Sequence, residues 1–242
     1  MELTSQNKWN RTFQKIQILN GAQLKYIAMF SMLLDHVNKA LLYPNLNNSA
    51  LLLLSDILDI LGRIAYPIFL FFLVEGFFKT KNRAKYLGSL LVFAVISEVP
   101  FDLFSTRTFF EPNMNNILFT FAMVLSMLWV IDFLKTRLPK AVWYFVSILI
   151  VAVMCLVSML TSVDYEYHAI LGGYFFYIFH RTYPLSIPFA FASMYKEPWA
   201  LLGFAFILTY NGERGKQNKW INYAFYPLHL FLLGLLRLWL NI

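Results

Sequence analysis

An acid and a base stand side by side near the end of the first apolar stretch of the sequence. Asp35 and His36 lie in Leu24–Lys39, a segment apolar enough to enter a lipid bilayer. Titratable side chains are costly in hydrocarbon, so those found there usually face a polar interior and serve a function. An imidazole titrates near neutral pH, and we therefore predict that His36 is a general base. Neighbouring helix positions point about 100° apart, so Asp35 is expected to face an adjacent helix when His36 faces the site.

Other polar residues occur inside the later apolar segments or at their ends. Asp164 is one of them. The predicted catalytic residues are Asp35, His36, Arg63, Glu98, Asn116 and His229. The sequence predicts a common chamber for these side chains in the outer half of a membrane. Two structural alternatives stay open. Arg63 can form an ion pair between helices with Glu98 or Asp35, and His229 can be a hydrogen-bonded core residue.

A second set of candidate residues is basic. Lys79, Lys81, Arg83 and Lys85 follow the second apolar segment, and Lys25 precedes His36 by eleven residues. Eleven residues rise about 16 Å on a helix, so Lys25 can lie at a membrane surface while His36 lies inside. The simplest interpretation of the basic run is a loop that sets membrane orientation. The alternative is a site for anionic phosphates.

Apolar helices must position these residues. Mean hydropathy is +0.58 and only 14% of the residues are charged, against about 25% in soluble domains. The sequence therefore predicts an all-α polytopic membrane protein with one bundle of nine spanning or partly spanning helices. These are Leu24–Leu42, Leu51–Val74, Tyr86–Phe104, Asn116–Leu134, Ala141–Leu160, Ala169–Phe179, Leu185–Met194, Trp199–Tyr210 and Trp220–Leu240. The sixth to eighth are shorter than the ~20 residues of a full span.

Two details refine this helix assignment. Pro67 cannot donate a backbone hydrogen bond to the Arg63 carbonyl, so the second helix is expected to bend there. Residues 1–23 form a separate cytoplasmic segment, followed by a single domain over 24–242. The first segment is expected to include an amphipathic helix on the membrane surface, with Lys8, Trp9, Arg11, Phe13, Lys15, Ile16 and Ile18.

Basic residues alternate between the predicted loops. If the N-terminus is cytoplasmic, the inner segments carry most of the 20 lysines and arginines, whereas the outer loops carry only Arg107 and Lys196. This pattern predicts nine crossings of the cytoplasmic membrane, with the N-terminus inside and the C-terminus outside. It also accounts for the net charge of +7 without a nucleic-acid partner.

Several motifs of soluble enzymes are absent from the sequence. It contains no GxSxG, HExxH, Walker A glycine loop or GxGxxG. The four histidines lack the spacing of metal ligands, so no metal is expected.

Four motifs in a fixed order point to one family. They are LKYIAMFSMLLDHVN in the first segment, GRIAYPIFLFFLVEG (Gly62–Gly76), NNILFTFA (Asn115–Ala122) and FYPLHL (Phe225–Leu230). They resemble the TraX family of integral membrane proteins, best known for N-terminal acetylation of conjugative pilin. DYEYHAILGG (Asp164–Gly173) looks like a more divergent family segment. The family is similar in plan to transmembrane acyltransferases that carry acetyl from cytoplasmic acetyl-CoA to an acceptor beyond the membrane. In those that modify surface sugars, a basic residue precedes a functional histidine by eleven positions, as Lys25 precedes His36, although arginine is more usual there.

The resemblance implies acyl transfer from acetyl-CoA as co-substrate. The acceptor would be a pilin-type N-terminal amine, another peptide or a surface glycan. His36 would take the acceptor proton, and Arg63 or the Asn116 amide would stabilise the oxyanion. The five basic residues Lys25, Lys79, Lys81, Arg83 and Lys85 would hold the CoA phosphates, with pantetheine passing between the helices.

Two other classes of function remain open from the sequence. A proton-coupled small-solute transporter would use the same intramembrane Asp, His, Arg and Glu residues, although the chain shows no internal repeat. A non-enzymatic assembly factor would use them only to hold helices together. Release of free CoA thiol is expected of the enzyme, and solute flux in vesicles is expected of the transporter.

Overall fold

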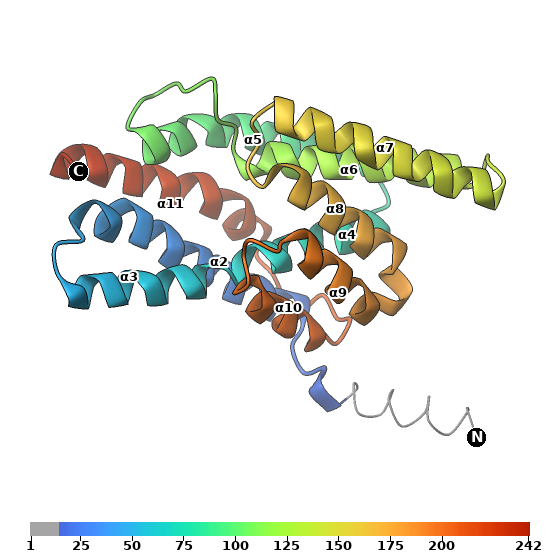
Figure 1. The fold of residues 1–242 in the computed structure, drawn as a ribbon, viewed down its shortest axis with the longest axis horizontal. Coiled ribbons are helices and arrows are strands. Elements are labelled where there is room, and N and C mark those ends of the chain that lie inside the picture. The colour runs from blue at the N-terminus through green and yellow to red at the C-terminus, as the bar shows by residue number, and fades with distance from the viewer. Residues whose placement is uncertain (1–14) are drawn as a thin grey trace.

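The computed structural model describes residues 15–242, apart from the side chains of Tyr183, Lys219 and Trp220. This part of the chain is a helical bundle (Figure 1). The α-helices are α2 Gly21–Val37, α3 Ser49–Gly62, α4 Ala65–Lys79, α5 Arg83–Thr106, α6 Ile117–Lys135, α7 Lys140–Leu160, α8 Glu166–Ile178, α9 Tyr183–Ser193, α10 Ala200–Leu208 and α11 Lys219–Leu240. A π-helical turn, Asn38–Leu42, continues α2, and short 3-10 turns cover Tyr43–Asn45 and His180–Thr182. Residues 8–14 of the predicted amphipathic helix lie outside the described residues.

The structure confirms an all-α polytopic fold. Each of the nine predicted segments contains helix. Five stretches are long and apolar enough to cross a membrane, namely Ser49–Lys79, Arg83–Thr106, Ile117–Lys135, Lys140–Leu160 and Ile221–Leu240. The protein is therefore a multi-pass membrane protein. Helices α8, α9 and α10 have only 13, 11 and 9 residues, so the number of crossings stays a prediction.

The predicted second helix is two helices. α3 ends at Gly62 and α4 begins at Ala65, with a turn at Arg63 and Ile64. This is the bend expected from Pro67, whose ring prevents a regular hydrogen bond to the preceding turn. Ser31 of α2 donates a hydrogen bond of 2.6 Å to the Leu61 carbonyl, which helps to satisfy the interrupted backbone. The break thereby holds Arg63 beside α2.

Helix α4 forms the centre of the bundle, because its apolar residues are buried on almost every side. Phe71 packs edge-on against Phe176 of α8 and against Tyr210, which follows α10. Gly203 of α10 lies so close to the α3–α4 break that an added Cβ would be 2.6 Å from the Ile64 carbonyl oxygen. This close approach holds the loop before α10 against the start of α4.

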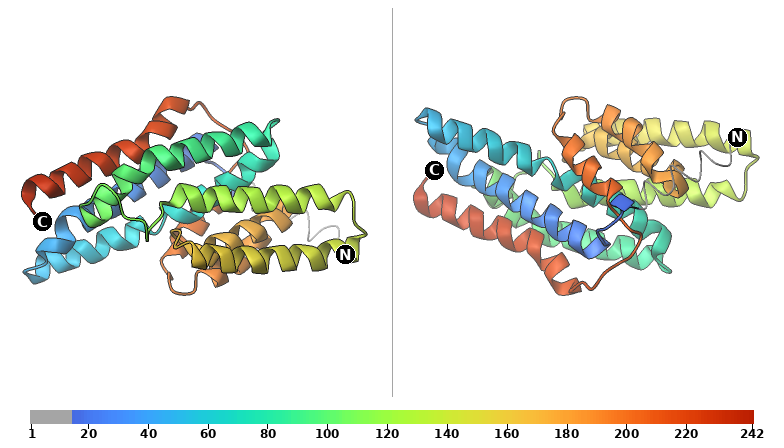
Figure 2. Two further views of the ribbon diagram at one scale, coloured as in Figure 1. Left: turned by 90° about the horizontal axis from the view of Figure 1, so that it is seen from above. Right: turned by 90° about the horizontal axis from the view of Figure 1, so that it is seen from below.

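The other helices are arranged in two groups. α5 and α11 pack along one another, as do α6 and α7. Figure 2 shows α6 and α7 side by side and displaced along the long axis of the molecule relative to α3, α5 and α11. Outward faces of α7 and α11 are apolar, with Phe145, Leu160 and Trp239 each more than two thirds exposed. Such faces suit contact with lipid.

Asparagine side chains fix the starts of four helices. Asn20, Asn48, Asn82 and Asn116 each accept a hydrogen bond from a backbone N–H in the first turn of α2, α3, α5 and α6. Such caps satisfy donors that have no partner within the helix. They define where α2 and α6 begin, and thus the register of the polar residues along them.

Candidate active site

Helices α2 and α4 run antiparallel and form a pocket at each end. Near the start of α2, Gly21 lies against Phe72 of α4, and near its end Asp35 lies against Gly62 just before α4. The first pocket, called here the Lys25 pocket, has a volume of about 430 Å³ and is lined by Gly21, Lys25, Phe72, Glu75, Gly76, Lys79, Thr80, Lys81, Tyr86, Tyr210, Arg214 and Gln217. The second, the His36 pocket, has about 290 Å³ and is lined by Asp35, His36, Lys39, Arg63, Asp164, Tyr165, His168, Met194, Lys196 and Glu197.

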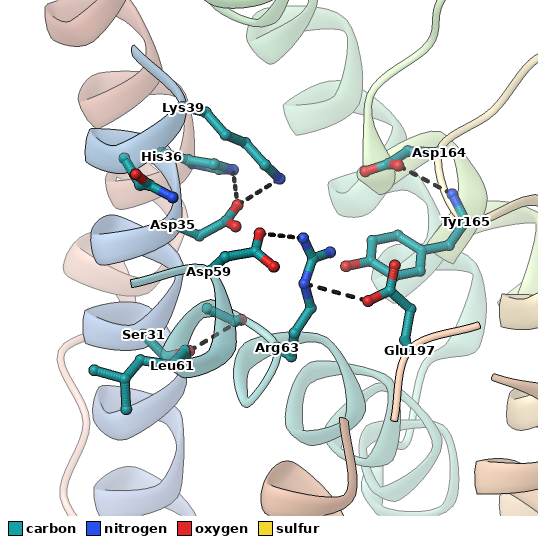
Figure 3. A network of polar contacts seen from close by, with 12 residues as sticks. Ser31, Asp35, His36, Lys39, Asp59, Leu61, Arg63, Asp164, Tyr165 and Glu197 are labelled. Carbon is teal, nitrogen blue, oxygen red and sulfur yellow. Dashed lines mark hydrogen bonds and ion pairs between the residues drawn. The ribbon is translucent and has the colours of Figure 1, made fainter. Parts of the chain in front are cut away.

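The end of α2 supplies an acid, a base and a cation to the His36 pocket (Figure 3). Lys39 Nζ lies 2.7 Å from Asp35 Oδ2, and His36 Nε2 lies 3.8 Å from the same oxygen. Asp35 and His36 contact different helices, as expected, because Asp35 lies against Gly62 at the end of α3 and His36 contacts His229 of α11. Both nevertheless line the same pocket. The His36 ring reaches back toward the carboxylate, so the angle between the two helix positions does not separate their polar atoms.

Arg63 enters the His36 pocket from the α3–α4 break. Its Nη2 lies 2.5 Å from Asp59 Oδ1, and its Nε lies 3.3 Å from Glu197 Oε2 (Figure 3). Neither predicted partner, Glu98 or Asp35, forms this ion pair. Asp59 lies one turn earlier on α3, and Glu197 arrives because α10 packs on the break. Arg63 is thus held by two carboxylates at the wall of the pocket.

The loop between α7 and α8 contributes Asp164 and Tyr165. Ser162, Tyr165 and Glu166 have positive φ angles of 49°, 59° and 37°, a conformation that is unfavourable for residues other than glycine. The Thr120 hydroxyl helps to hold the loop by donating a 2.6 Å hydrogen bond to the Asp164 carbonyl. Tyr165 stacks on Tyr66 with ring centroids 3.7 Å apart. The fold therefore maintains a strained loop that presents these two side chains to the pocket.

Asp164 titrates in an unusual range. The residue retains solvent contact, but surrounding protein atoms partly desolvate its carboxyl, and this burial raises the pKa of Asp164 to about 6. The positive charges of Lys39 and Arg63 oppose that rise in pKa. Asp164 is therefore largely ionised at pH 7 and becomes neutral in mild acid.

His229 binds His36 from α11. Its Nε2 lies 2.7 Å from His36 Nδ1, and its own Nδ1 lies 2.6 Å from the Phe225 carbonyl oxygen. A carbonyl only accepts, so we assign the proton of neutral His229 to Nδ1, which makes its Nε2 an acceptor. His36 then donates from Nδ1, and its Nε2 keeps a free lone pair. This arrangement leaves a base in the pocket wall, beside Asp35.

Glu98 and Asn116 lie outside the His36 pocket. The Asn116 amide donates hydrogen bonds to the Glu98 carboxylate and, at 2.9 Å, to the Ala94 carbonyl. The Asn116 side-chain oxygen caps α6. The predicted chamber thus contains His36, Arg63 and Asp164, with His229 behind them. Glu98 and Asn116 instead form a separate contact between α5 and α6.

The Lys25 pocket has an excess of positive charge. Lys79 is paired with Glu75 at 2.8 Å, and Glu75 also contacts His180 at 2.8 Å. Within the described residues, Lys25, Lys81 and Arg214 have no carboxylate at ion-pair distance. Lys25 Nζ lies 3.4 Å from Gln217 Oε1 and 5.1 Å from the centre of the Phe72 ring. Three cations without acidic partners make this pocket suitable for an anion.

The structure separates the predicted phosphate-binding residues. Lys25, Lys79 and Lys81 line the Lys25 pocket, whereas Arg83 and Lys85 do not. Arg83 instead pairs with Asp132 of α6 at 2.7 Å and packs on Phe77. At the start of α5, Arg83 is therefore engaged by α6 and α4 and does not reach the Lys25 pocket.

Sequence reasoning missed several lining residues. In the His36 pocket these are Lys39, Tyr165, His168, Lys196 and Glu197; in the Lys25 pocket they are Thr80, Tyr86, Tyr210, Arg214 and Gln217. Lys39 carried a usable signal, because it lies one helical turn after Asp35. Thr80 lies within the basic run, and Tyr165 and His168 lie in the segment Asp164–Gly173, but their residue types gave no reason to place them in a site. The remaining residues come from loops or distant helices. In the described part of the chain, no cluster of three or more His, Cys, Asp or Glu residues could hold a metal ion.

Comparison with known proteins assigns the chain to a family. The chain is 40% identical over 116 residues to a protein of Dichelobacter nodosus described as "Probable fimbrial assembly protein FimC, serogroup H1". That alignment covers 43% of this chain and 43% of the relative, well under two thirds of its length. No solved structure matches the chain. The family model described as "TraX protein" matches residues 20–237, which include both pockets, and the chain therefore belongs to the TraX family.

Proposed function

We propose that this protein is a membrane acetyltransferase that takes acetyl from acetyl-CoA at the Lys25 pocket and gives it to an acceptor at the His36 pocket. The observation that carries the proposal is the pairing of two different polar pockets at opposite ends of α2 and α4. One has cations without acidic partners, and the other has a histidine base among balanced charges. Acetyl transfer needs both kinds of site, because the donor phosphates require cations and the acceptor requires a base that takes its proton.

The donor end fits phosphates. Lys25, Lys81 and Arg214 offer positive charge from three separate elements, and the Thr80 and Gln217 side chains add hydrogen-bonding groups. Charge-assisted hydrogen bonds of this kind are the strongest that a phosphate makes with protein side chains. The excess of positive charge near the starts of α2 and α5 also favours a cytoplasmic location for this end.

His36 supplies the chemistry at the other end. An acceptor amine attacks the thioester carbonyl carbon, and its N–H proton passes to His36 Nε2. The resulting imidazolium faces Asp35, 3.8 Å away. The C–S bond then breaks, and His36 returns the proton to the departing thiolate, so CoA leaves as the free thiol. Arg63 supplies positive charge for the oxyanion.

The donor must extend along α2. Lys25 and His36 are eleven residues apart, a rise of about 16 Å. Buried Leu24, Ala28, Ile68 and Tyr66 lie on α2 and α4 between the two pockets. Acetyl transfer therefore requires these two helices to part far enough for the pantetheine arm.

A pilin-like peptide is the preferred acceptor, because the D. nodosus relative is described as a fimbrial assembly protein. Asp164 supports an amine in particular, since among the described residues this pocket carboxylate has no cation at ion-pair distance and attracts the protonated amine before reaction. Another peptide or a surface glycan is the alternative. In each case the acceptor meets the His36 pocket from the outer side of the cytoplasmic membrane.

The decisive experiment measures thiol release from acetyl-CoA by the purified protein in nanodiscs. Three acceptors are compared: a pilin-like peptide with a free N-terminal amine, the same peptide already N-acetylated, and a sugar alcohol of matched concentration. We expect release only with the free amine, with a mass gain of one acetyl group on that peptide. Absence of both acetyl-CoA binding and thiol release, together with solute flux in vesicles, would replace the proposal with a transporter.

A further inference from the structure

A third pocket opens between the ends of α6 and α8 and the start of α7. This Lys135 pocket has a volume of about 280 Å³ and is lined by Lys135, Leu138, Lys140, Trp143, Tyr144, Tyr177 and Ile178. Trp143 and Tyr177 are buried and form its floor, whereas both lysines and Tyr144 are exposed at its rim. The proposed acetyl transfer uses none of these residues.

The two lysines of the Lys135 pocket lack an acidic partner. Within the described residues, neither ammonium lies within 4.0 Å of a carboxylate. The nearest acid along α6, Asp132, already binds Arg83 at 2.7 Å and the Tyr177 hydroxyl at 2.8 Å. Lys135 Nζ lies instead over the rings of Trp143 and Tyr177, at 5.3 and 5.6 Å from their centres. The pocket therefore presents positive charge with no counterion.

The pocket continues into a surface that suits acyl chains. α7 rises from it, and its outward side chains Phe145, Ile148 and Leu160 are 71, 62 and 84% exposed. Such a face is stable only against hydrocarbon. A molecule with an anionic head and apolar tails would fit both parts, with its head at the lysines and its tails along α7.

We propose that the Lys135 pocket binds the phosphate group of an anionic phospholipid. Lys135 and Lys140 contact the phosphate oxygens, and Trp143 and Tyr144 pack against the glycerol region. Basic pockets between helices at a membrane surface bind anionic headgroups because charge attraction and acyl-chain burial act together. The site holds the lipid whether or not the protein transfers acetyl.

The test is native mass spectrometry of the full chain in detergent, titrated with dioleoylphosphatidylglycerol, dioleoylphosphatidylcholine or inorganic phosphate. The variant Lys135→Gln/Lys140→Gln is compared with Lys85→Gln/Lys216→Gln, which removes the same charge from two exposed lysines outside the pocket. We expect the pocket variant to bind phosphatidylglycerol roughly 30-fold more weakly and the control to match the wild type. Phosphatidylcholine should bind wild type and pocket variant equally.

Two results would overturn the assignment. Equal phosphatidylglycerol affinity in wild type and pocket variant would show that the Lys135 pocket does not bind the lipid. Displacement of phosphatidylglycerol by inorganic phosphate at comparable concentration would assign the pocket to the free ion and exclude a lipid. If the double variant fails to fold, Lys140→Gln alone decides the matter, since this exposed residue should change lipid affinity roughly fivefold.

Discussion

The two pockets on α2 and α4 differ in how their charges are arranged. In the Lys25 pocket, Lys25, Lys81 and Arg214 face a shared space without acidic partners. In the His36 pocket, by contrast, Arg63 is paired with Asp59 and Glu197, and Asp35 is paired with Lys39. Unpaired charge attracts a ligand, whereas paired charge fixes side chains in place. The first pocket is therefore suited to binding and the second to chemistry, and separate variants should affect the two properties independently.

Loss of the base should have the largest effect. His36→Ala removes the base that takes the acceptor proton in our proposal, so we expect turnover to fall about 10²–10⁴-fold. Acetyl-CoA affinity should stay near that of the wild type, because the Lys25 pocket lies at the opposite end of α2. Thiol release and equilibrium binding measured on the same folded sample check both statements. A parallel loss of binding would mean that the two ends do not work separately.

Removal of unpaired cations should produce the converse result. Lys25→Gln/Arg214→Gln should weaken acetyl-CoA binding roughly 10–100-fold, since each charge-assisted contact with a phosphate is lost. Turnover at saturating donor should change little. Isothermal titration at two salt concentrations provides the measurement, and the wild-type affinity should fall more steeply with salt than that of the variant. Lys15→Gln/Arg137→Gln serves as the charge-matched control. An equal loss of acetyl-CoA affinity in this control would show that the net charge of the protein, and not the Lys25 pocket, determines binding.

The contact between His36 and His229 should have an intermediate effect. His229→Phe removes the acceptor for His36 Nδ1–H, so the base is no longer held in one tautomer, and we expect turnover to fall about tenfold. His229→Gln keeps an acceptor oxygen and should recover part of that loss. The pH profile of turnover distinguishes positioning from packing, because only loss of the hydrogen bond should shift its midpoint. Identical profiles for wild type and His229→Phe would show that His229 acts through packing alone.

The smallest effect is expected at Asn116. Asn116→Ala removes the cap of α6 and the partner of Glu98, so we expect about 1 kcal/mol of lost stability and unchanged turnover in the protein that remains folded. Thermal denaturation in detergent, paired with thiol release per folded molecule, measures both. A drop in turnover without a drop in melting temperature would restore the catalytic role that the sequence suggested for this residue.

Much of this arrangement was readable from local sequence. Hydropathy identified the apolar segments, Pro67 marked the break beside Arg63, and the basic run after α4 marked an end of the bundle that binds anions in our proposal. These features depend on residues that are close in the sequence, whose spacing sets the length of each helix, its bend and the position of its apolar face. Lys79 and Lys81 were found for that reason, and so was the placement of His36 on the same helix as Lys25.

The partners of these residues were decided only by tertiary structure. His36 meets His229 across 193 positions, and Lys25 meets Gln217 across 192. Arg63 takes Glu197 because α10 packs on the α3–α4 break, whereas Glu98 is bound by Asn116 across α5 and α6. A sequence states which side chains are polar and roughly how deep each one lies. Which of them touch depends on how each helix is rotated and on which neighbour it packs against, and that is set by the summed packing of the whole bundle.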